Sequence, residues 1–273
     1  MPYDLAFIGA GNMAEAIARG LLSSNTLTPE KLIAADVAEP RRKLFAEQLK
    51  IAAVESPVEA AKDAKAILLA VKPQQMTEAL AGLGAAISEK TLVVSIAAGV
   101  TTRQIETGLG LGKRWKVVRT MPNTPMLVGQ GAVALAPGAF ATRADVTAAK
   151  EFFAPAAEVI ETTEDKLDAV TALSGSGPAY VFYLVEHMIA AGVELGLTPD
   201  HAALLAKQTV LGSATMAKAG PDSPQELRRK VTSPNGTTQA AIESMDAAGV
   251  GTAIRAAIAA AAKRSVELRE GAR

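Results

Sequence analysis

Short apolar runs alternate with helical patterns through the first half of the chain. The runs have strand length and end at Gly, Pro, Lys or Asp; they cover residues 5–8, 32–35, 66–71 and 92–96. Further short strands are predicted at residues 115–119, 131–135 and 158–162. Helical patterns stand between several of them, at residues 15–22, 40–45 and 143–153. Because continuous apolar runs are typical of strands that are covered on both faces, the pattern predicts a parallel sheet between two layers of helices.

The strand pattern stops near residue 163. Every later segment has helical periodicity, with Gly, Pro and Ser between segments; these cover residues 165–173, 179–195, 199–219, 223–231, 238–247 and 251–270. The shift predicts two domains, an α/β domain over residues 1–163 and an all-α domain over residues 164–273. The apolar stretch 179–196 contains Glu186, His187 and Glu194, which are costly to place in hydrocarbon, so we expect a core or interface helix and no membrane partner.

Composition narrows the function classes. The 273 residues include 28 Lys and Arg against 28 Asp and Glu, so net charge gives no reason to expect a nucleic-acid partner. Cysteine is absent, which excludes disulfides and thiolate chemistry, and no His, Asp and Glu spacing predicts a metal site. The first residues lack the pattern of a secretory signal, so we expect a cytoplasmic location.

A glycine-rich turn follows the first apolar run and opens the first helical pattern. In such units the glycine at the position of Gly9 permits a tight turn, the one at Gly11 lets a pyrophosphate approach the backbone, and a small residue such as Ala14 allows close helix packing. Asp36 ends the second strand, where a ribose-binding carboxylate is expected. The pattern predicts a doubly wound sheet of the Rossmann type that binds a dinucleotide; the alternative is that the glycines only make a turn.

The residues after the second strand point to different dinucleotides. The carboxylate of Asp36 favours NADH, because it can accept hydrogen bonds from the ribose hydroxyls. Arg41 and Arg42 favour NADPH, because they can neutralise a 2′-phosphate. The sequence therefore leaves the choice between NADPH and NADH open.

Several loops have the composition of ligand-binding segments. Val71–Pro73, Ala97–Gly99 and Met121–Pro125 each follow a predicted strand, and ligands of doubly wound sheets lie at the carboxyl ends of strands. In the helical half, the loops 173–179 and 233–238 offer small residues and hydroxyls before a helix, which suits a carboxylate or a phosphate. Ordinary helix capping by Ser and Thr is the alternative.

Six segments together resemble the pyrroline-5-carboxylate reductases. They are residues 7–14, 70–73, 95–100, 119–125, 174–180 and 233–238, in the order of the family and over nearly the whole chain. The resemblance implies an oxidoreductase that reduces 1-pyrroline-5-carboxylate to L-proline with NADPH or NADH, as the final step of proline biosynthesis. It also implies a helical domain that interlocks two copies in a homodimer, often assembled further into a ring.

The resemblance also implies roles for individual residues. The cofactor contacts it implies are Gly9, Ala10, Gly11, Asn12, Met13, Val71, Lys72, Pro73, Ala97, Ala98, Gly99 and Asn123, and the ribose argument adds Asp36. The substrate contacts are Ser176, Ser233, Gly236, Thr237 and Thr238. We expect Thr238 to be the catalytic hydroxyl nearest the imine nitrogen. Asn235 stands where the family often has glycine, and Asn tolerates a positive φ better than most residues.

Two other functions are compatible with parts of this pattern. A β-hydroxyacid or imine reductase has a similar layout, but such enzymes usually carry a catalytic Lys in the first long helix of the second domain, and residues 179–196 contain none. The other alternative is a dimer that senses a dinucleotide without catalysis. Oxidation of NADPH on addition of pyrroline-5-carboxylate distinguishes the three.

Overall fold

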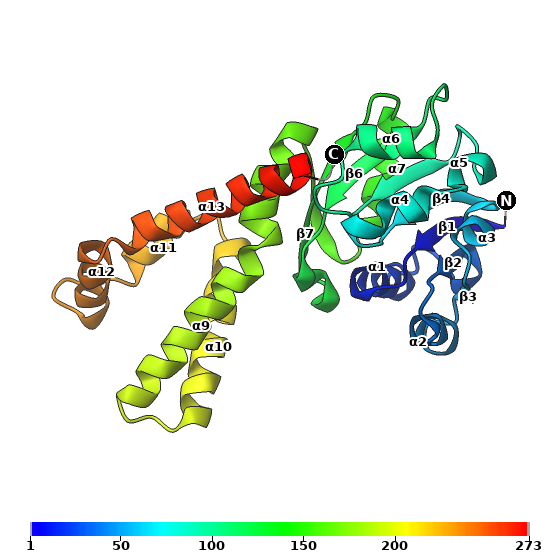
Figure 1. Ribbon diagram of the computed structural model, residues 1–273. Helices are drawn as coiled ribbons and strands as arrows, with labels where there is room; N and C mark the ends of the chain where they lie inside the picture. Colours follow the sequence, from blue (N-terminus) through cyan, green and yellow to red (C-terminus); the bar gives the residue numbers. More distant parts are fainter. Residues whose placement is uncertain (1, 272–273) are drawn as a thin grey trace. The chain divides into compact units, whose positions relative to one another are not determined.

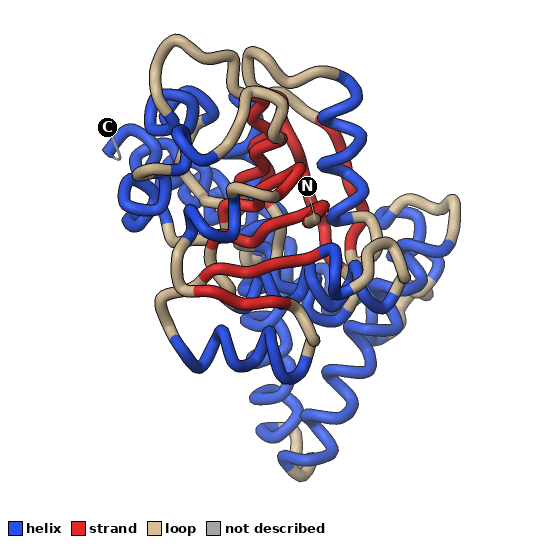
Figure 2. The backbone as a smooth tube through the Cα atoms, turned by 90° about the vertical axis from the view of Figure 1, so that its right-hand side faces the viewer, coloured by secondary structure: helices blue, strands red, loops and turns tan. Residues whose placement is uncertain are grey.

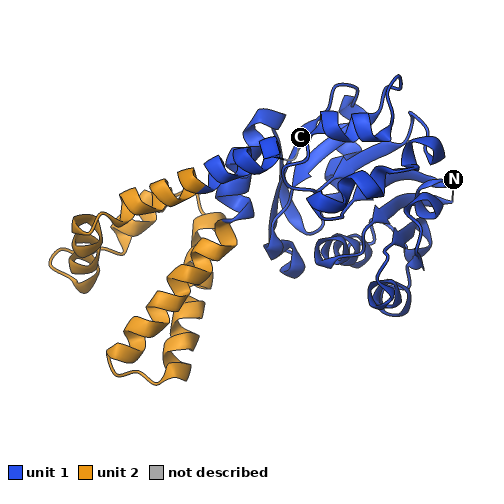
Figure 3. Cartoon of the chain, viewed as in Figure 1, with its two compact units in different colours: residues 1–176, 261–273 blue, residues 177–260 orange. Residues whose placement is uncertain are grey.

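The computed structural model describes residues 2–271, and its contacts divide the chain into two compact units (Figure 3). The first unit consists of the residues up to Ser176 together with those from Ala261 onward. The second unit is Gly177–Ala260. Residues 164–175 are helical, as the composition shift predicts, but by their contacts they group with the sheet.

An eight-stranded sheet forms the centre of the first unit, in the order β3-β2-β1-β4-β5-β6-β7-β8 (Figure 1). The strands are β1 (Tyr3–Ile8), β2 (Leu32–Ala35), β3 (Ala52–Val54), β4 (Ala64–Leu69), β5 (Leu92–Ser95), β6 (Lys116–Met121), β7 (Gly131–Pro137) and β8 (Ala157–Glu161). All neighbours are parallel except β6 and β7, whose register pairs Arg119 with Ala136.

The expectation of a fully parallel sheet was therefore wrong at one edge. Only the short helix η4 (Thr124–Val128) lies between β6 and β7. A parallel connection needs a crossover of about a dozen residues or more, usually a helix, so this link returns the chain in the opposite direction. The doubly wound α/β class itself is confirmed.

Helices cover both faces of the sheet (Figure 2). They are α1 (Asn12–Ser23), α2 (Glu39–Lys43), α3 (Pro57–Ala61), α4 (Met76–Leu80), α5 (Leu83–Ala86), α6 (Thr102–Leu109), α7 (Arg143–Phe153) and α8 (Leu167–Val170), with the short helices η1 (Pro29–Lys31), η2 (Leu44–Gln48), η3 (Pro73–Gln75), η5 (Glu164–Lys166) and η6 (Thr171–Gly175). Alternate residues of β1 enter separate cores: Phe7 packs with Phe45 on one face, and Ile8 belongs to the cluster of Trp115 on the other. Burial on both faces explains the continuous apolar runs.

The second unit is helical throughout its regular structure. Its helices are α9 (Gly177–Glu194), α10 (Pro199–Ala219), α11 (Pro224–Lys230), α12 (Thr237–Ala247) and the first part of α13 (Val250–Gly271), which continues into the first unit. Among the described residues, no single helix is long and apolar enough to span a membrane; α12 and α13 meet that test only as a pair bent by 54°.

The helices α9 and α10 pack on each other but bury little in the single chain. No residue of α9 is buried, and α10 buries only Ala202 and Ala206. The large apolar side chains left exposed on the two helices are Val181, Phe182, Tyr183, Leu184, Val193, Leu204, Leu205, Leu211 and Met216. The stretch around α9 is therefore no core helix of this chain, and an apolar surface of this extent is typical of a protein interface.

Candidate functional site

The glycine turn after β1 has the geometry that a dinucleotide requires. Gly9 has φ +99°, and a Cβ there would lie 2.8 Å from the carbonyl oxygen of Ala70, so only glycine fits. Gly11 caps the N-terminus of α1, and a Cβ there would meet nothing within 4 Å. Among the described residues no side chain caps α1. Open space next to uncapped N–H groups suits a pyrophosphate.

The turn opens into a cavity of about 520 Å³ at the carboxyl ends of β1, β2 and β4. Five of the predicted cofactor residues line it: Gly9, Gly11, Asp36, Val71 and Lys72. The strand order reverses at β1, which lies between β2 and β4, and doubly wound sheets bind their ligands at such a point. The other described residues predicted to contact cofactor, namely Ala10, Asn12, Met13, Pro73, Ala97, Ala98, Gly99 and Asn123, do not line this cavity.

Asp36 is bonded to the glycine turn. Its Oδ2 accepts the N–H of Ala10 at 2.7 Å, and its Oδ1 accepts the N–H of Ala38 at 2.8 Å. The side chain of Arg41 donates to the carbonyl oxygen of Ala10, so both peptide groups that flank the Ala10 Cα are hydrogen-bonded. Arg42 donates to the carbonyl oxygen of Asp36 at 2.8 Å. The carboxylate thus fixes the turn, and both guanidinium groups lie at the same end of β2.

Arg41 also connects the turn to α1. Its guanidinium pairs with Glu15 at 2.9 Å, and Glu15 pairs with Arg19 on its other oxygen. Burial opposes ionisation of Glu15, but the hydrogen bonds from Arg19 and Arg41 outweigh it and hold the pKa of Glu15 below its ordinary value. Glu15 is therefore a carboxylate that orients Arg41 beside the turn.

The loop after β5 is the next predicted cofactor segment. Ala97 is buried, and its N–H donates to Ser95 Oγ at 3.3 Å. Gly99 has φ +75°, a conformation that favours glycine. The loop lies at the carboxyl end of β5, beside β4, on the same edge of the sheet as the glycine turn.

Asn123 makes contacts that the sequence did not predict. Its Nδ2 donates to the carbonyl oxygen of Ser174 at 3.1 Å, and its Oδ1 accepts the N–H of Ala132 at 2.9 Å. The residue is 8% exposed. Its amide therefore joins the loop after β6 to β7 and to η6, and Ser176, a predicted substrate contact, directly follows this π-helical turn.

The predicted substrate loop lies in the second unit, before α12. Asn235 has φ +59°, which confirms that it adopts the left-handed conformation expected of it. Gly236 is extended, and a Cβ there would lie 3.0 Å from the carbonyl oxygen of Ser233, so this glycine is needed for close approach. Thr237 and Thr238 open α12, which no side chain caps within the described part of the chain. Hydroxyls and free N–H groups therefore gather at one helix N-terminus.

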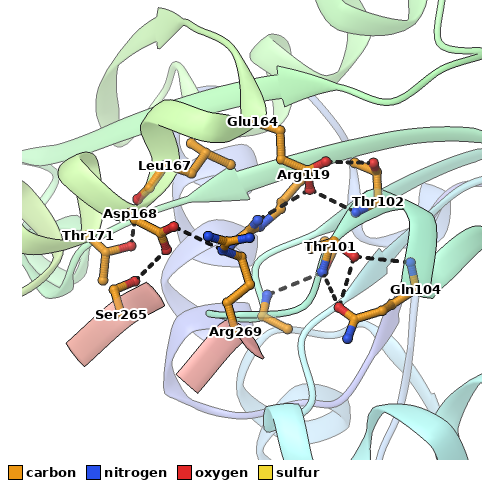
Figure 4. A network of polar contacts seen from close by, with 12 residues as sticks. Thr101, Thr102, Gln104, Arg119, Glu164, Leu167, Asp168, Thr171, Ser265 and Arg269 are labelled. Carbon is orange, nitrogen blue, oxygen red and sulfur yellow. Dashed lines mark hydrogen bonds and ion pairs between the residues drawn. The ribbon is translucent and has the colours of Figure 1, made fainter. Parts of the chain in front are cut away.

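A buried polar network in the first unit was missed by sequence reasoning (Figure 4). Arg119, 3% exposed, pairs with Glu164 at 3.2 Å, and Glu164 accepts two hydrogen bonds from Thr102. Asp168 binds Ser265 and Arg269 of α13. The one available signal was Arg119, a charged residue at the end of the predicted strand 115–119. Within residues 2–271, no group of three His, Asp or Glu is placed to hold a metal ion.

Known proteins resemble the chain over nearly its whole length. The family model described as pyrroline-5-carboxylate reductase dimerisation matches residues 164–268, and the model described as NADP oxidoreductase coenzyme F420-dependent matches residues 4–99. The pyrroline-5-carboxylate reductase of Pseudomonas aeruginosa is 42% identical over 97% of both chains, and that of Arabidopsis thaliana is 36% identical over 97% of this chain and 95% of its own.

Solved structures of pyrroline-5-carboxylate reductases are also similar to the chain. The pyrroline-5-carboxylate reductase of Coxiella burnetii superposes with a TM-score of 0.91 at 36% identity, covering 98% of this chain and 99% of its own. The Plasmodium falciparum pyrroline carboxylate reductase, solved with NADP bound, gives a TM-score of 0.86 at 29% identity, covering 98% of both chains. The chain therefore belongs to the pyrroline-5-carboxylate reductase family.

Proposed function

We propose that the chain reduces 1-pyrroline-5-carboxylate to L-proline with NADPH or NADH, the final step of proline biosynthesis. The observation that carries the proposal is the combination, in one chain, of the Gly9–Gly11 turn at the cavity and the Ser233–Thr238 loop at the N-terminus of α12. The similarity to pyrroline-5-carboxylate reductases over 97% of the chain supports the assignment of the substrate.

The cavity and the turn fit a nicotinamide dinucleotide. The N–H groups at the start of α1, including those of Asn12 and Met13, would hold the pyrophosphate in the open space at Gly11. Asp36 would lie at the adenosine ribose. Val71–Pro73, Ala97–Gly99 and Asn123 would lie at the nicotinamide half. When bound, the reduced nicotinamide supplies a hydride to the imine carbon.

The Ser233–Thr238 loop would hold the substrate. A carboxylate at the N-terminus of α12 gains from the N–H groups of Thr237 and Thr238 and from the helix dipole. The Ser233 hydroxyl and the Gly236 backbone would also bind the carboxylate. Ser176, which the resemblance implies as a substrate contact, stays a prediction. An imine nitrogen that is protonated in the substrate becomes the amine of proline once the neighbouring carbon receives hydride. Thr238 orients that nitrogen or relays its proton, so its main contribution is positioning.

The second unit would join two copies of the chain. The exposed apolar side chains of α9 and α10 need a partner surface, and the match to the dimerisation model covers these helices. We propose an interlocked homodimer, or a larger ring built from such dimers. A cytoplasmic location stays a prediction.

The assay that tests this function follows the loss of NADPH absorbance when pyrroline-5-carboxylate is added and identifies proline in the product. A dinucleotide sensor would bind NADPH without turnover. A β-hydroxyacid reductase would ignore the imine and reduce a keto or semialdehyde acid instead. Either outcome would refute the proposal.

Thr238→Ala tests the role of the hydroxyl. We expect kcat to fall by about 10- to 100-fold, which is at or below the roughly 100-fold minimum of a full proton donor, because the main contribution of Thr238 is positioning. NADPH affinity should be unchanged, and Thr238→Ser should recover most of kcat. Thr147→Ala is a matched control, because that exposed threonine bonds only to the carbonyl oxygen of Arg143 among the contacts described for its hydroxyl. An unchanged kcat in Thr238→Ala would remove Thr238 from the mechanism.

A further inference from the structure

The end of α13 lies against the loop that follows β5. A Cβ placed on Gly99 would be 3.6 Å from the backbone nitrogen of Arg269 and 3.8 Å from the carbonyl carbon of Leu268. The loop and the helix therefore approach through their backbones, with no side chain of Gly99 between them. This helix segment belongs to the first unit, together with the loop.

Two bonds to one carboxylate hold this end of α13. The hydroxyl of Ser265 donates to Asp168 Oδ1 at 2.7 Å, and Arg269 Nε donates to Asp168 Oδ2 at 3.0 Å. Ser265 and Arg269 are one helical turn apart and so share a face of α13. The Asp168 side chain is only 9% exposed. A nearly buried carboxylate is costly unless it is paired, so these contacts favour one position of the helix end.

The segment 164–168, which contains Asp168, also holds the chain that follows the Ala97–Gly99 loop. Glu164, one helical turn before Asp168, accepts the backbone N–H of Thr102 at 2.8 Å and its hydroxyl at 2.9 Å. Thr102 opens α6, directly after the loop. Buried Arg119 of β6 holds Glu164 in turn (Figure 4). Residues 164–168 therefore tie both the helix that follows the loop and the helix that covers it.

We propose that Asp168, Ser265 and Arg269 form a clamp that sets the position of the Ala97–Gly99 loop and thereby the affinity for the dinucleotide. The inference rests on the proposed function, which places the nicotinamide half at this loop. The three residues are positioning residues: they act through the backbone of α13 on a loop that contacts cofactor. They have no part in holding the imine, whose proposed contacts are Ser176 and the 233–238 loop.

Arg269→Ala tests the clamp by direct titration of NADPH, followed by its fluorescence, with steady-state kinetics beside it. We expect the Kd and the KM for NADPH to rise about 5- to 10-fold, the range for loss of a partly exposed charged hydrogen bond. The KM for pyrroline-5-carboxylate and kcat at saturating NADPH should stay within about 2-fold. Arg269→Lys should recover most of the affinity, because an ammonium can still pair with Asp168. Ser265→Ala should raise the Kd in the same direction.

Arg264→Ala is the matched control. Arg264 lies on the same helix, is exposed, and pairs with Glu267 at 2.9 Å, away from Asp168. The clamp is refuted if Arg269→Ala and Ser265→Ala bind NADPH as tightly as Arg264→Ala. It is also refuted if Arg269→Ala lowers thermal stability and kcat while the NADPH Kd is unchanged, because that pattern indicates a purely structural role. Failure of the wild-type chain to bind either NADPH or NADH would instead refute the proposed function, on which the clamp depends.

Discussion

Replacement of Asp36 by Ser is expected to shift the dinucleotide preference toward NADPH. The carboxylate stands at the end of β2, in the cavity, and is fixed by the N–H groups of Ala10 and Ala38. A 2′-phosphate on a ribose bound at this point would place a second anion beside it. Serine removes the charge and keeps one oxygen that can accept one of the two hydrogen bonds.

The size of the shift follows from the repulsion and its screening. Two unit charges about 5 Å apart repel by about 3 kcal/mol at an effective dielectric constant of about 20, and by about 0.8 kcal/mol in water. Asp36 is half-buried, so a value of about 1–2 kcal/mol is expected, which corresponds to a factor of about 5–30. Loss of a hydrogen bond to the turn costs about 1 kcal/mol. That cost weakens both dinucleotides alike and cancels from their ratio.

The assay measures kcat/KM for NADPH and for NADH in the wild type and in Asp36→Ser. We expect the NADPH/NADH ratio to rise about 5- to 30-fold. Asp36→Asn is the matched variant, since it removes the charge but turns an amide donor toward the N–H of Ala10 or Ala38. It should shift the ratio in the same direction while weakening both dinucleotides more. An unchanged ratio in both variants would show that the bound ribose lies away from Asp36.

Two further predictions concern the turn and acid stability. Gly9→Ala should lower the free energy of unfolding by about 2–4 kcal/mol, because the new Cβ would meet a backbone oxygen at 2.8 Å in a positive-φ conformation. Gly11→Ala should keep the melting temperature and weaken NADPH binding, because the Cβ there would enter the open space beside α1. Equal melting temperatures for the two variants would contradict the different roles of these glycines. For Asp145, burial opposes ionisation, but hydrogen bonds from Thr142 and Lys116 outweigh it and hold its pKa below the ordinary 3.8. The contribution of ionised Asp145 to the free energy of unfolding is therefore complete above pH 3.8 and is lost as the pH falls through the lowered pKa. The free energy of unfolding in urea should depend less steeply on pH in acid for Asp145→Asn than for the wild type. Identical pH dependence in the two proteins would refute the stabilising role of the Asp145 carboxylate.

The sequence predicted those parts of the fold that leave a local hydrophobic pattern, repeated from one element to the next. The sequence pattern identified seven of the eight strands. In β1, β2, β4 and β5 the signal is a continuous apolar run, because a strand covered on both faces is apolar at successive positions, as in Leu5–Ile8. The strand β3 was missed because Ala52–Val54 is short, lies at the sheet edge and is half exposed. The direction of β7 was also missed, since an apolar run reads the same in either direction and only the short link after β6 decides it.

Site residues that are close together in the sequence could be predicted, whereas contacts between distant residues could not. Gly9 and Gly11 are a compact motif, and the structure places them with Asp36, Val71 and Lys72 around one cavity. The network of Glu164 and Asp168 was not predictable, because its bonds join residues 45 to 101 positions apart. The roles of all the site residues, Thr238 above all, stay predictions.

Transfer of deuterium from the cofactor tests the central claim most directly. NADPH deuterated at the transferring position of C4 is incubated with the protein and pyrroline-5-carboxylate, and the proline is analysed by mass spectrometry and NMR. The account predicts proline with one deuterium on its δ-carbon, the former imine carbon. Proline without deuterium, or oxidation of NADPH without proline, would contradict it.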